Sequence, residues 1–127
     1  MIGPEGFSLL FVDDESDFLA TIDEFFTSLG YTVHTASNGQ EALLRIKEHV
    51  PNAVFLDISM PQMDGTETLK LIHEINANIQ VIVVSGYASE DLARNLLKYG
   101  ACDFLQKPVD LMRLHETVER LQTLQDL

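Results

Sequence analysis

Five short apolar runs, each followed by a segment with helical spacing, are the feature that most constrains this fold. The runs have the length of strands: FSLLFV (7–12), YTVHTA (31–36), AVFL (53–56), IQVIVV (79–84) and ACDFL (101–105). Near-continuous apolar runs are typical of strands buried on both faces of a parallel sheet. The run at 31–36 alternates apolar and polar residues instead, which indicates an edge strand.

Between these runs, apolar residues recur three and four positions apart, which places them on one face of a helix. The first such segment starts at Phe18 and ends before Gly30, and the others cover 39–49, 65–75, 89–98 and 110–124. The inward faces are expected to carry Phe18, Leu19, Ile22, Phe25, Phe26, Leu29, Ala42, Leu43, Ile46, Leu69, Ile72, Ile75, Leu92, Leu96, Leu97, Leu111, Leu114, Val118 and Leu121. A strand–helix unit repeated five times with short connections predicts a doubly wound α/β fold with helices on both faces of a parallel sheet.

The composition limits the classes of partner. The chain has 127 residues, 46% of them hydrophobic, and a net charge of −12. That length fits one domain, and the acidic charge argues against nucleic acid or an anionic membrane as a direct partner. No apolar run is long enough to span a bilayer, no lysine or arginine precedes Arg45, and Cys102 is the sole cysteine. These features predict a cytoplasmic protein without a signal peptide or an internal disulfide.

Polar residues follow the apolar runs where the carboxyl ends of the strands are expected. They are Asp13 and Asp14, Ser37 to Gly39, Asp57, Ser85 and Gly86, and Lys107 and Pro108. In a doubly wound sheet these ends meet at one edge, where ligands bind. Carboxylates about 5 Å apart repel by roughly 3 kcal/mol per pair at an effective dielectric near 20. A bound cation would relieve this repulsion.

The residue types at this edge favour phosphoryl chemistry. Carboxylates without histidine or cysteine suit Mg²⁺, which binds one or two carboxylates together with phosphate oxygens. The Lys107 ammonium is a compact positive charge suited to a phosphate oxygen, and the Ser85 hydroxyl, beside the unhindered backbone of Gly86, can donate to another. Asp57 is then the carboxylate able to attack phosphorus and form an acyl phosphate.

Together these stretches resemble the receiver domains of bacterial two-component response regulators. The matching stretches are FVDDES, ASNGQEAL (36–43), FLDISMPQMDG (55–65), VVSGYAS (83–89) and GACDFLQKP (100–108). The resemblance covers residues 7 to about 122. It implies a flavodoxin-like (βα)5 sandwich with strand order 2-1-3-4-5, and a phosphoacceptor that assists only its own phosphorylation and dephosphorylation.

The resemblance also implies roles for the acidic residues. Asp57 matches the phosphoacceptor, and Asp14 matches a direct Mg²⁺ ligand. Asp13 matches a ligand that acts mostly through water, and the backbone carbonyl of Ser59 matches the third protein ligand. Lys107 matches the counter-ion of the phosphoryl group. Glu15 is expected just outside the metal shell.

Further roles concern the switch. Ser85 matches the switch hydroxyl, and the peptide bond before Pro108 is expected to be cis, an accessible geometry for an X-Pro bond. Phe104 stands at the switch aromatic, where the family often has Tyr, so no phenol hydroxyl holds the outward state. Gly65 is expected to be structural, with Asp64 starting the helix.

The expected partners are a sensor histidine kinase or a histidine phosphotransfer protein, and a downstream protein or effector domain. A homodimer could form through the face of the fourth helix, fifth strand and last helix. The expected boundaries are a tail at 1–6, the receiver domain at 7–122, and at 123–127 the end of the last helix or the start of a linker. A stand-alone regulator and a receiver from a longer DNA-binding regulator or hybrid kinase both stay open.

Two rival functions fit parts of the pattern. A phosphatase with an aspartate nucleophile is hinted at by DGT (64–66), but no apolar strand precedes it and the second residue after Asp57 is Ser59. A flavodoxin-like FMN carrier has a similar topology, but carboxylates stand where it needs a phosphate-binding loop. Hydrolysis of a generic phosphate ester tests the first rival, and the colour of the purified protein tests the second.

Plainer roles compete for single residues. Asp13 and Asp14 could form a helix N-cap and a solvated acidic turn, Asp57 could cap a strand end, and Ser85 could start a turn. The four histidines are expected to be separate surface residues, and Cys102 a small buried one. The leucines of the last helix are expected in the core, although their spacing could also serve a dimer.

Overall fold

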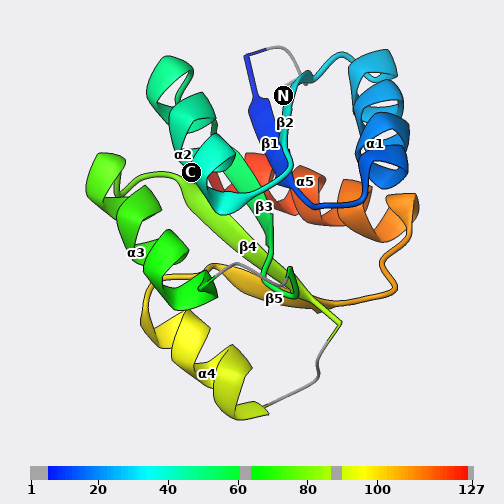
Figure 1. Ribbon diagram of the computed structural model, residues 1–127. Coiled ribbons are helices and arrows are strands. Elements are labelled where there is room, and N and C mark those ends of the chain that lie inside the picture. The colour runs from blue at the N-terminus through cyan, green and yellow to red at the C-terminus, as the bar shows by residue number, and fades with distance from the viewer. Residues whose placement is uncertain (1–5, 61–63, 87–89, 126–127) are drawn as a thin grey trace.

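A computed structural model describes residues 6–60, 64–86 and 90–125. Five parallel strands form one sheet in the order β2-β1-β3-β4-β5, and a helix follows each strand (Figure 1). The elements are β1 Ser8–Val12, α1 Ser16–Ser28, β2 Thr32–Ala36, α2 Gly39–Glu48, β3 Ala53–Asp57, α3 Gly65–Ile75, β4 Gln80–Ser85, α4 Glu90–Lys98, β5 Asp103–Gln106 and α5 Leu111–Gln125. The predicted fold class and strand order are confirmed. Most of the expected tail, the last two residues, and parts of the 55–65 and 83–89 motifs lie outside the described residues.

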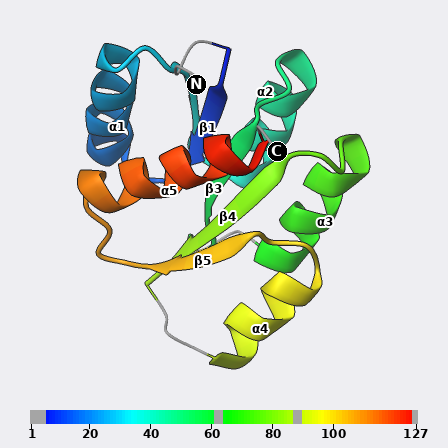
Figure 2. The same ribbon diagram turned by 180° about the vertical axis from the view of Figure 1, so that it is seen from behind.

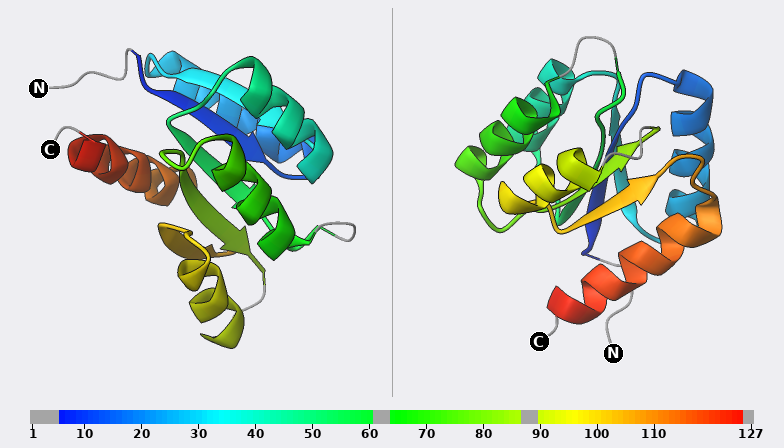
Figure 3. Two further views of the ribbon diagram at one scale, coloured as in Figure 1. Left: turned by 90° about the vertical axis from the view of Figure 1, so that its left-hand side faces the viewer. Right: turned by 90° about the horizontal axis from the view of Figure 1, so that it is seen from below.

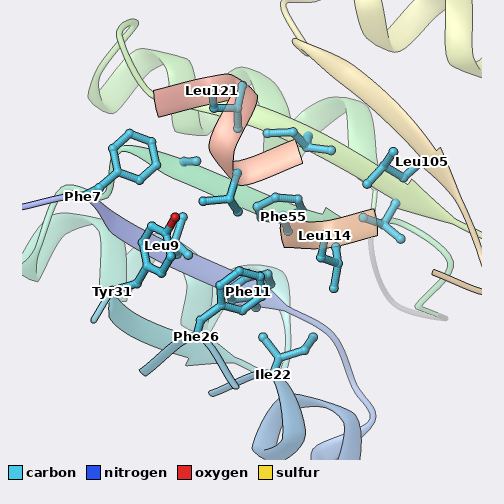
Figure 4. Packing of buried hydrophobic residues seen from close by; sticks show 14 of the residues in the cluster. Phe7, Leu9, Phe11, Ile22, Phe26, Tyr31, Phe55, Leu105, Leu114 and Leu121 are labelled. Carbon is cyan, nitrogen blue, oxygen red and sulfur yellow. The ribbon is translucent and has the colours of Figure 1, made fainter. Parts of the chain in front are cut away.

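The helices form one layer on each side of the sheet. Helices α1 and α5 cover one face, and α2, α3 and α4 cover the other (Figures 2 and 3). The α1/α5 side holds an aromatic cluster in which Phe11 stacks on Phe55 with ring centroids 4.9 Å apart (Figure 4). The other side is aliphatic and is centred on β1, β3 and β4. The predicted assignment of β2 to a sheet edge is confirmed.

The strand register places the acidic residues next to each other. Phe11 of β1 and Phe55 of β3 are register partners, and both side chains pack on the α1/α5 side. Because side chains alternate between the faces of a strand, the residues two positions further on share that side. These residues are Asp13 and Asp57, both buried. The same register that packs the aromatic core therefore brings the two carboxylates together.

Some apolar positions differ from the expected inward faces. Leu29 is the C-cap of α1 and is 38% exposed, and Leu97 of α4 is 47% exposed. The prediction that Cys102 is buried was wrong: it is exposed, because it lies in the turn before β5 rather than in the strand. Phe104 is only partly buried, because β5 is an edge strand.

Short polar side chains cap the first turns of α2 and α3. Asp64 and Asn38 are the N-caps of α3 and α2, and each accepts a hydrogen bond from the backbone three residues on. The predicted helix-starting role of Asp64 is confirmed. A Cβ on Gly65 would lie 2.6 Å from Cγ2 of Ile58, so this position is glycine because two segments approach closely. No helix within the described ranges is long and apolar enough to cross a bilayer.

Candidate functional site

The centre of the site is a lysine between two buried aspartates. The Nζ of Lys107 donates to Oδ2 of Asp57 at 2.8 Å and to Oδ2 of Asp13 at 2.9 Å. Asp57 and Asp13 are 3% and 4% exposed, whereas the Lys107 side chain is 22% exposed. The ammonium thus offsets part of the repulsion between the two carboxylates. Lys107 follows β5, and the peptide bond between it and Pro108 is cis.

The remaining oxygen of each aspartate accepts from the residue two positions further along the chain. Oδ1 of Asp57 accepts from the Ser59 amide at 2.8 Å and from the Ser59 hydroxyl at 2.5 Å. Oδ1 of Asp13 accepts from the Glu15 amide at 2.9 Å. Each aspartate therefore holds the backbone two residues on, a common turn arrangement for this residue type. These contacts fix the orientation of both carboxylates.

The electrostatics follow from burial and from the shared lysine. Burial raises the pKa of the Asp13 carboxyl, and its hydrogen bond to Lys107 lowers that pKa by less. Burial lowers the pKa of the Lys107 amine, but hydrogen bonds and charge attraction from Asp57 and Asp13 outweigh it, so its pKa is raised overall. Lys107 is therefore a permanent cation at neutral pH.

Asp14 is the solvent-facing member of the acidic group. Carboxylate oxygens of Asp13, Asp14 and Asp57 lie within 4.8 Å of one another, and Asp14 is exposed while the other two are buried. An oxygen-only donor set with one open side fits a hard cation that keeps several waters, such as Mg²⁺. The N-cap of α1 is Glu15, so neither Asp13 nor Asp14 is the cap of that helix.

A cleft leads from Asp14 between α2 and α3. Its volume is about 590 Å³, and Asp14, Ser37, Asn38, Met60 and Asp64 are among the residues that line it. The polar residues after β2 therefore border the approach to the acidic group. On the opposite side, a cavity of only about 20 Å³ lies among Asp13, Asp57, Lys107 and the aromatic core. Access to the carboxylates is from the Asp14 side.

Ser85 and Phe104 lie diagonally across β4 and β5. Ser85 ends β4 and is fully buried. Its register partner is Gln106, and Val83 pairs with Phe104, so Ser85 and Phe104 share one face of the sheet. Phe104 packs against the cluster beneath α2, α3 and α4. The Ser85 carbonyl also accepts from the Lys107 amide at 2.8 Å, which joins Ser85 to the lysine.

Reasoning from the sequence missed two contacts. It assigned only the Ser59 carbonyl, although the Ser59 hydroxyl bonds directly to Asp57. A serine two residues after a strand-end aspartate was the available signal, because aspartates often bond the residue at that spacing. It also missed the Phe18 ring, whose centroid lies 5.8 Å from Nζ of Lys107. Helical spacing indicated only that Phe18 faces inward.

Comparisons with known proteins agree with this geometry. A family model described as "Response regulator receiver domain" matches residues 9–119. The transcriptional regulatory protein ZraR of Klebsiella oxytoca is 40% identical over 114 residues, 90% of this chain but 26% of that protein. The chain thus spans about a quarter of the length of the ZraR relatives. The chemotaxis protein CheY of Thermotoga maritima is 34% identical, covering 91% of this chain and 98% of CheY.

A solved structure shows the same arrangement of elements. The CheX–CheY–BeF₃–Mg²⁺ complex of Borrelia burgdorferi has a chain that matches with a TM-score of 0.83 at 35% identity, over 93% of this chain and 90% of that one. The order of strands and helices is that of this family. The chain belongs to the response regulator receiver domains, the phosphoacceptor modules of two-component signalling.

Proposed function

We propose that Asp57 is the phosphoacceptor of this receiver domain. The observation that carries the proposal is the position of Asp57, a buried carboxylate at the end of β3 with Lys107 on one oxygen and Ser59 on the other. Asp57 therefore contacts both the ammonium of Lys107 and the hydroxyl of Ser59. Asp13 contacts the same ammonium and the Glu15 amide, and Asp14 is exposed.

The transfer is a displacement at phosphorus. A carboxylate oxygen of Asp57 forms the new P–O bond while the P–N bond to a phosphohistidine breaks, and the imidazole leaves with the bonding electron pair and takes up a proton. A small acyl phosphate donor loses its carboxylate in the same way. Lys107 is placed to move from the carboxylates to a phosphoryl oxygen, because its Nζ already lies 2.8 Å from Asp57.

The proposed cofactor is Mg²⁺, held by Asp13, Asp14, Asp57 and the backbone carbonyl of Ser59. When bound, it would neutralise charge on the phosphoryl oxygens. The donor set supports this choice, because the clustered ligand atoms are carboxylate oxygens within 4.8 Å of one another. The CheY structure from Borrelia burgdorferi, which was solved with BeF₃ and Mg²⁺, supports the same ligand chemistry for this chain.

The proposed signal runs from Ser85 to Phe104. A phosphoryl oxygen on Asp57 offers the Ser85 hydroxyl a charge-assisted hydrogen bond that the free carboxylate does not. Because Ser85 and Phe104 share one face of the sheet, movement of Ser85 makes room for the Phe104 ring to turn inward. The face that would report this change consists of α4, β5 and α5. Phosphorylation shifts the equilibrium between the two conformations of this face only as far as the phosphoryl group interacts more favourably with one of them.

The proposed phosphoryl donor is a sensor histidine kinase or a histidine phosphotransfer protein, and the proposed compartment is the cytoplasm. For the output of the domain, we keep two proposals: a single-domain regulator, or a receiver that belongs to a longer regulator. Similarity over the whole length of CheY supports a single-domain regulator. Similarity to a quarter of ZraR supports a receiver that belongs to a longer regulator. Residues 7–122 are the proposed receiver domain in both.

Acetyl phosphate tests the proposal without a cognate kinase. With Mg²⁺, intact-mass spectra of the wild-type chain should show one added phosphoryl group that hydroxylamine removes, as expected of an acyl phosphate. Asp57→Asn should abolish the adduct, and Asp14→Asn should slow its formation because a metal ligand is lost. An adduct that persists in Asp57→Asn would overturn the assignment of the nucleophile.

A further inference from the structure

Two histidines that are 15 positions apart in the sequence lie together at the sheet edge. His34 is in the edge strand β2 and His49 is the C-cap of α2. The centroids of their imidazole rings are 5.1 Å apart, and the ring planes differ by 9°. The expectation that the histidines are separate surface residues was therefore wrong for this pair. His34 is half-buried and His49 is exposed.

The ring nitrogens of this pair have no protein partner among the described residues. The other two histidines differ: Nε2 of His73 lies 3.3 Å from the Ile79 carbonyl, and Nε2 of His115 lies 4.0 Å from Glu119. Within the described part of the chain, no hydrogen bond or ion pair occupies either ring of His34 or His49. The imidazoles of His34 and His49 are therefore available to an external ligand.

The separation of the rings matches that of two ligands on one metal ion. With a Zn–N distance near 2.0–2.1 Å, a ring centroid lies about 3.2 Å from the ion, so two imidazoles at the tetrahedral angle have centroids about 5.2 Å apart. The observed 5.1 Å is close to this distance. The exposed His49 ring has to turn about χ2 to aim one nitrogen at the shared point, and this torsion has a broad range in histidine.

The surroundings favour a cation at this place. His49 lies at the carboxyl end of α2, where the helix dipole carries partial negative charge. The chain as a whole has a net charge of −12. Imidazole nitrogen suits Zn²⁺, Cu²⁺ and Ni²⁺, whereas Mg²⁺ prefers oxygen ligands. This site is therefore chemically distinct from the carboxylate cluster.

We propose that His34 and His49 form a binding site for a transition-metal dication of the zinc class. The two imidazoles supply two ligands, and water fills the other positions of the ion. A metal held this way links the edge strand β2 to the end of α2. Binding to the folded state alone then stabilises the domain by linkage.

Zinc titration of the full chain tests the proposal. Saturating Mg²⁺ is present throughout, so that the carboxylate cluster is occupied. Affinity is measured by calorimetry, and the ring nitrogens of ¹⁵N-histidine are followed by NMR. The variants are His34→Gln and His49→Gln, with His115→Gln as the matched control, and circular dichroism establishes that each variant is folded.

We expect Zn²⁺ to shift the ring nitrogens of His34 and His49 together. Each single variant should weaken binding by at least about tenfold, since loss of even a supporting residue at a metal site has that effect. His115→Gln should bind as the wild type does. Unchanged affinity in either variant, or a shift at only one of the two rings, would overturn the paired site. Shifts confined to the neighbourhood of Asp14 would assign the zinc to the carboxylates instead.

Discussion

The Nζ of Lys107 lies 2.8 Å from Oδ2 of Asp57, although 50 residues separate them in the sequence. The same ammonium lies 2.9 Å from Asp13. An apolar strand can therefore end in a group of acidic residues, because the fold brings the ammonium of Lys107, which follows β5, between the two buried carboxylates. In the proposed mechanism this cation also binds an oxygen of the phosphoryl group on Asp57.

Replacing Lys107 with Met should leave two buried carboxylates without their cation. We expect the free energy of unfolding to fall by about 3 kcal/mol without metal, the usual cost of removing one partner from a buried ion pair. Mg²⁺ should restore part of this loss, and by more than it stabilises the wild type, because it then supplies the missing positive charge. Urea unfolding with and without Mg²⁺ measures both effects. Lys47→Met, at an exposed position in α2, is the control and should change little.

The pH dependence of stability should report on Asp13. Because burial raises the pKa of Asp13 above its ordinary value of 3.8, the folded state binds this proton more tightly than the unfolded state does. Stability without metal therefore falls as pH rises through the interval between the two pKa values, and then levels off. The Asp13→Asn side chain does not titrate, so it makes no such contribution to the pH dependence of stability.

The measurement is urea unfolding of the wild type and Asp13→Asn from about pH 4 to pH 8 in the absence of metal. We expect the stability of Asp13→Asn relative to the wild type to rise with pH at the acidic end and then to stay constant. The raised pKa of Lys107 acts only at alkaline pH and leaves this window unaffected. A difference that is flat or falls across the acidic range would contradict the effect of burial on Asp13.

Gly100 should resist substitution where Gly86 does not. Gly100 has a φ of +106°, and a Cβ there would lie 2.7 Å from the His73 ring. Gly100→Ala should therefore cost about 1–3 kcal/mol, since an L residue is strained in that backbone region and the ring is too close. Gly86→Ala meets nothing within 4 Å and is the matched control. Thermal unfolding of both variants tests this prediction. Equal melting temperatures would contradict the claim that backbone conformation and the His73 ring require glycine at position 100.

The proposed switch predicts a response that depends on Ser85. With Mg²⁺ and beryllofluoride, a phosphoryl mimic, we expect NMR shifts in the wild type that reach from the site across residues 90–110. In Ser85→Ala the response should stop near Asp57, because the hydroxyl that follows the phosphoryl oxygen is missing. Asn95→Ala, on the exposed side of α4, is a control that should respond like the wild type. A full response in Ser85→Ala would contradict the proposed switch, because the signal would then reach residues 90–110 without the Ser85 hydroxyl.

The fold was predictable because its signals are local and repeated. Apolar runs of strand length and helical spacing alternate along the whole chain, and the topology of such units is restricted. The short polar residues after the strands indicated where the site would form. Gly65 was correctly singled out, but its reason is the close approach of Ile58, which no local pattern shows.

Contacts between distant segments were harder to predict. The pairing of His34 with His49 depends on where the end of α2 meets the edge strand, and neither residue follows a pattern that marks this meeting. The exposure of Cys102 depends on β5 starting at Asp103, two residues later than the apolar run suggested. Such errors at element ends are common, because hydrophobic periodicity does not define the terminal residue.

The identity of the phosphorylated carboxylate is the central claim, and chemical trapping tests it most directly. Borohydride reduces an aspartyl phosphate to homoserine, which peptide mass spectrometry locates in the sequence. After treatment with acetyl phosphate and Mg²⁺, we expect homoserine at position 57 and none at positions 13 and 14. The test is strict, because carboxylate oxygens of all three aspartates lie within 4.8 Å of one another. Homoserine at either of those two positions, or its absence from position 57 in a phosphorylated sample, would contradict the account.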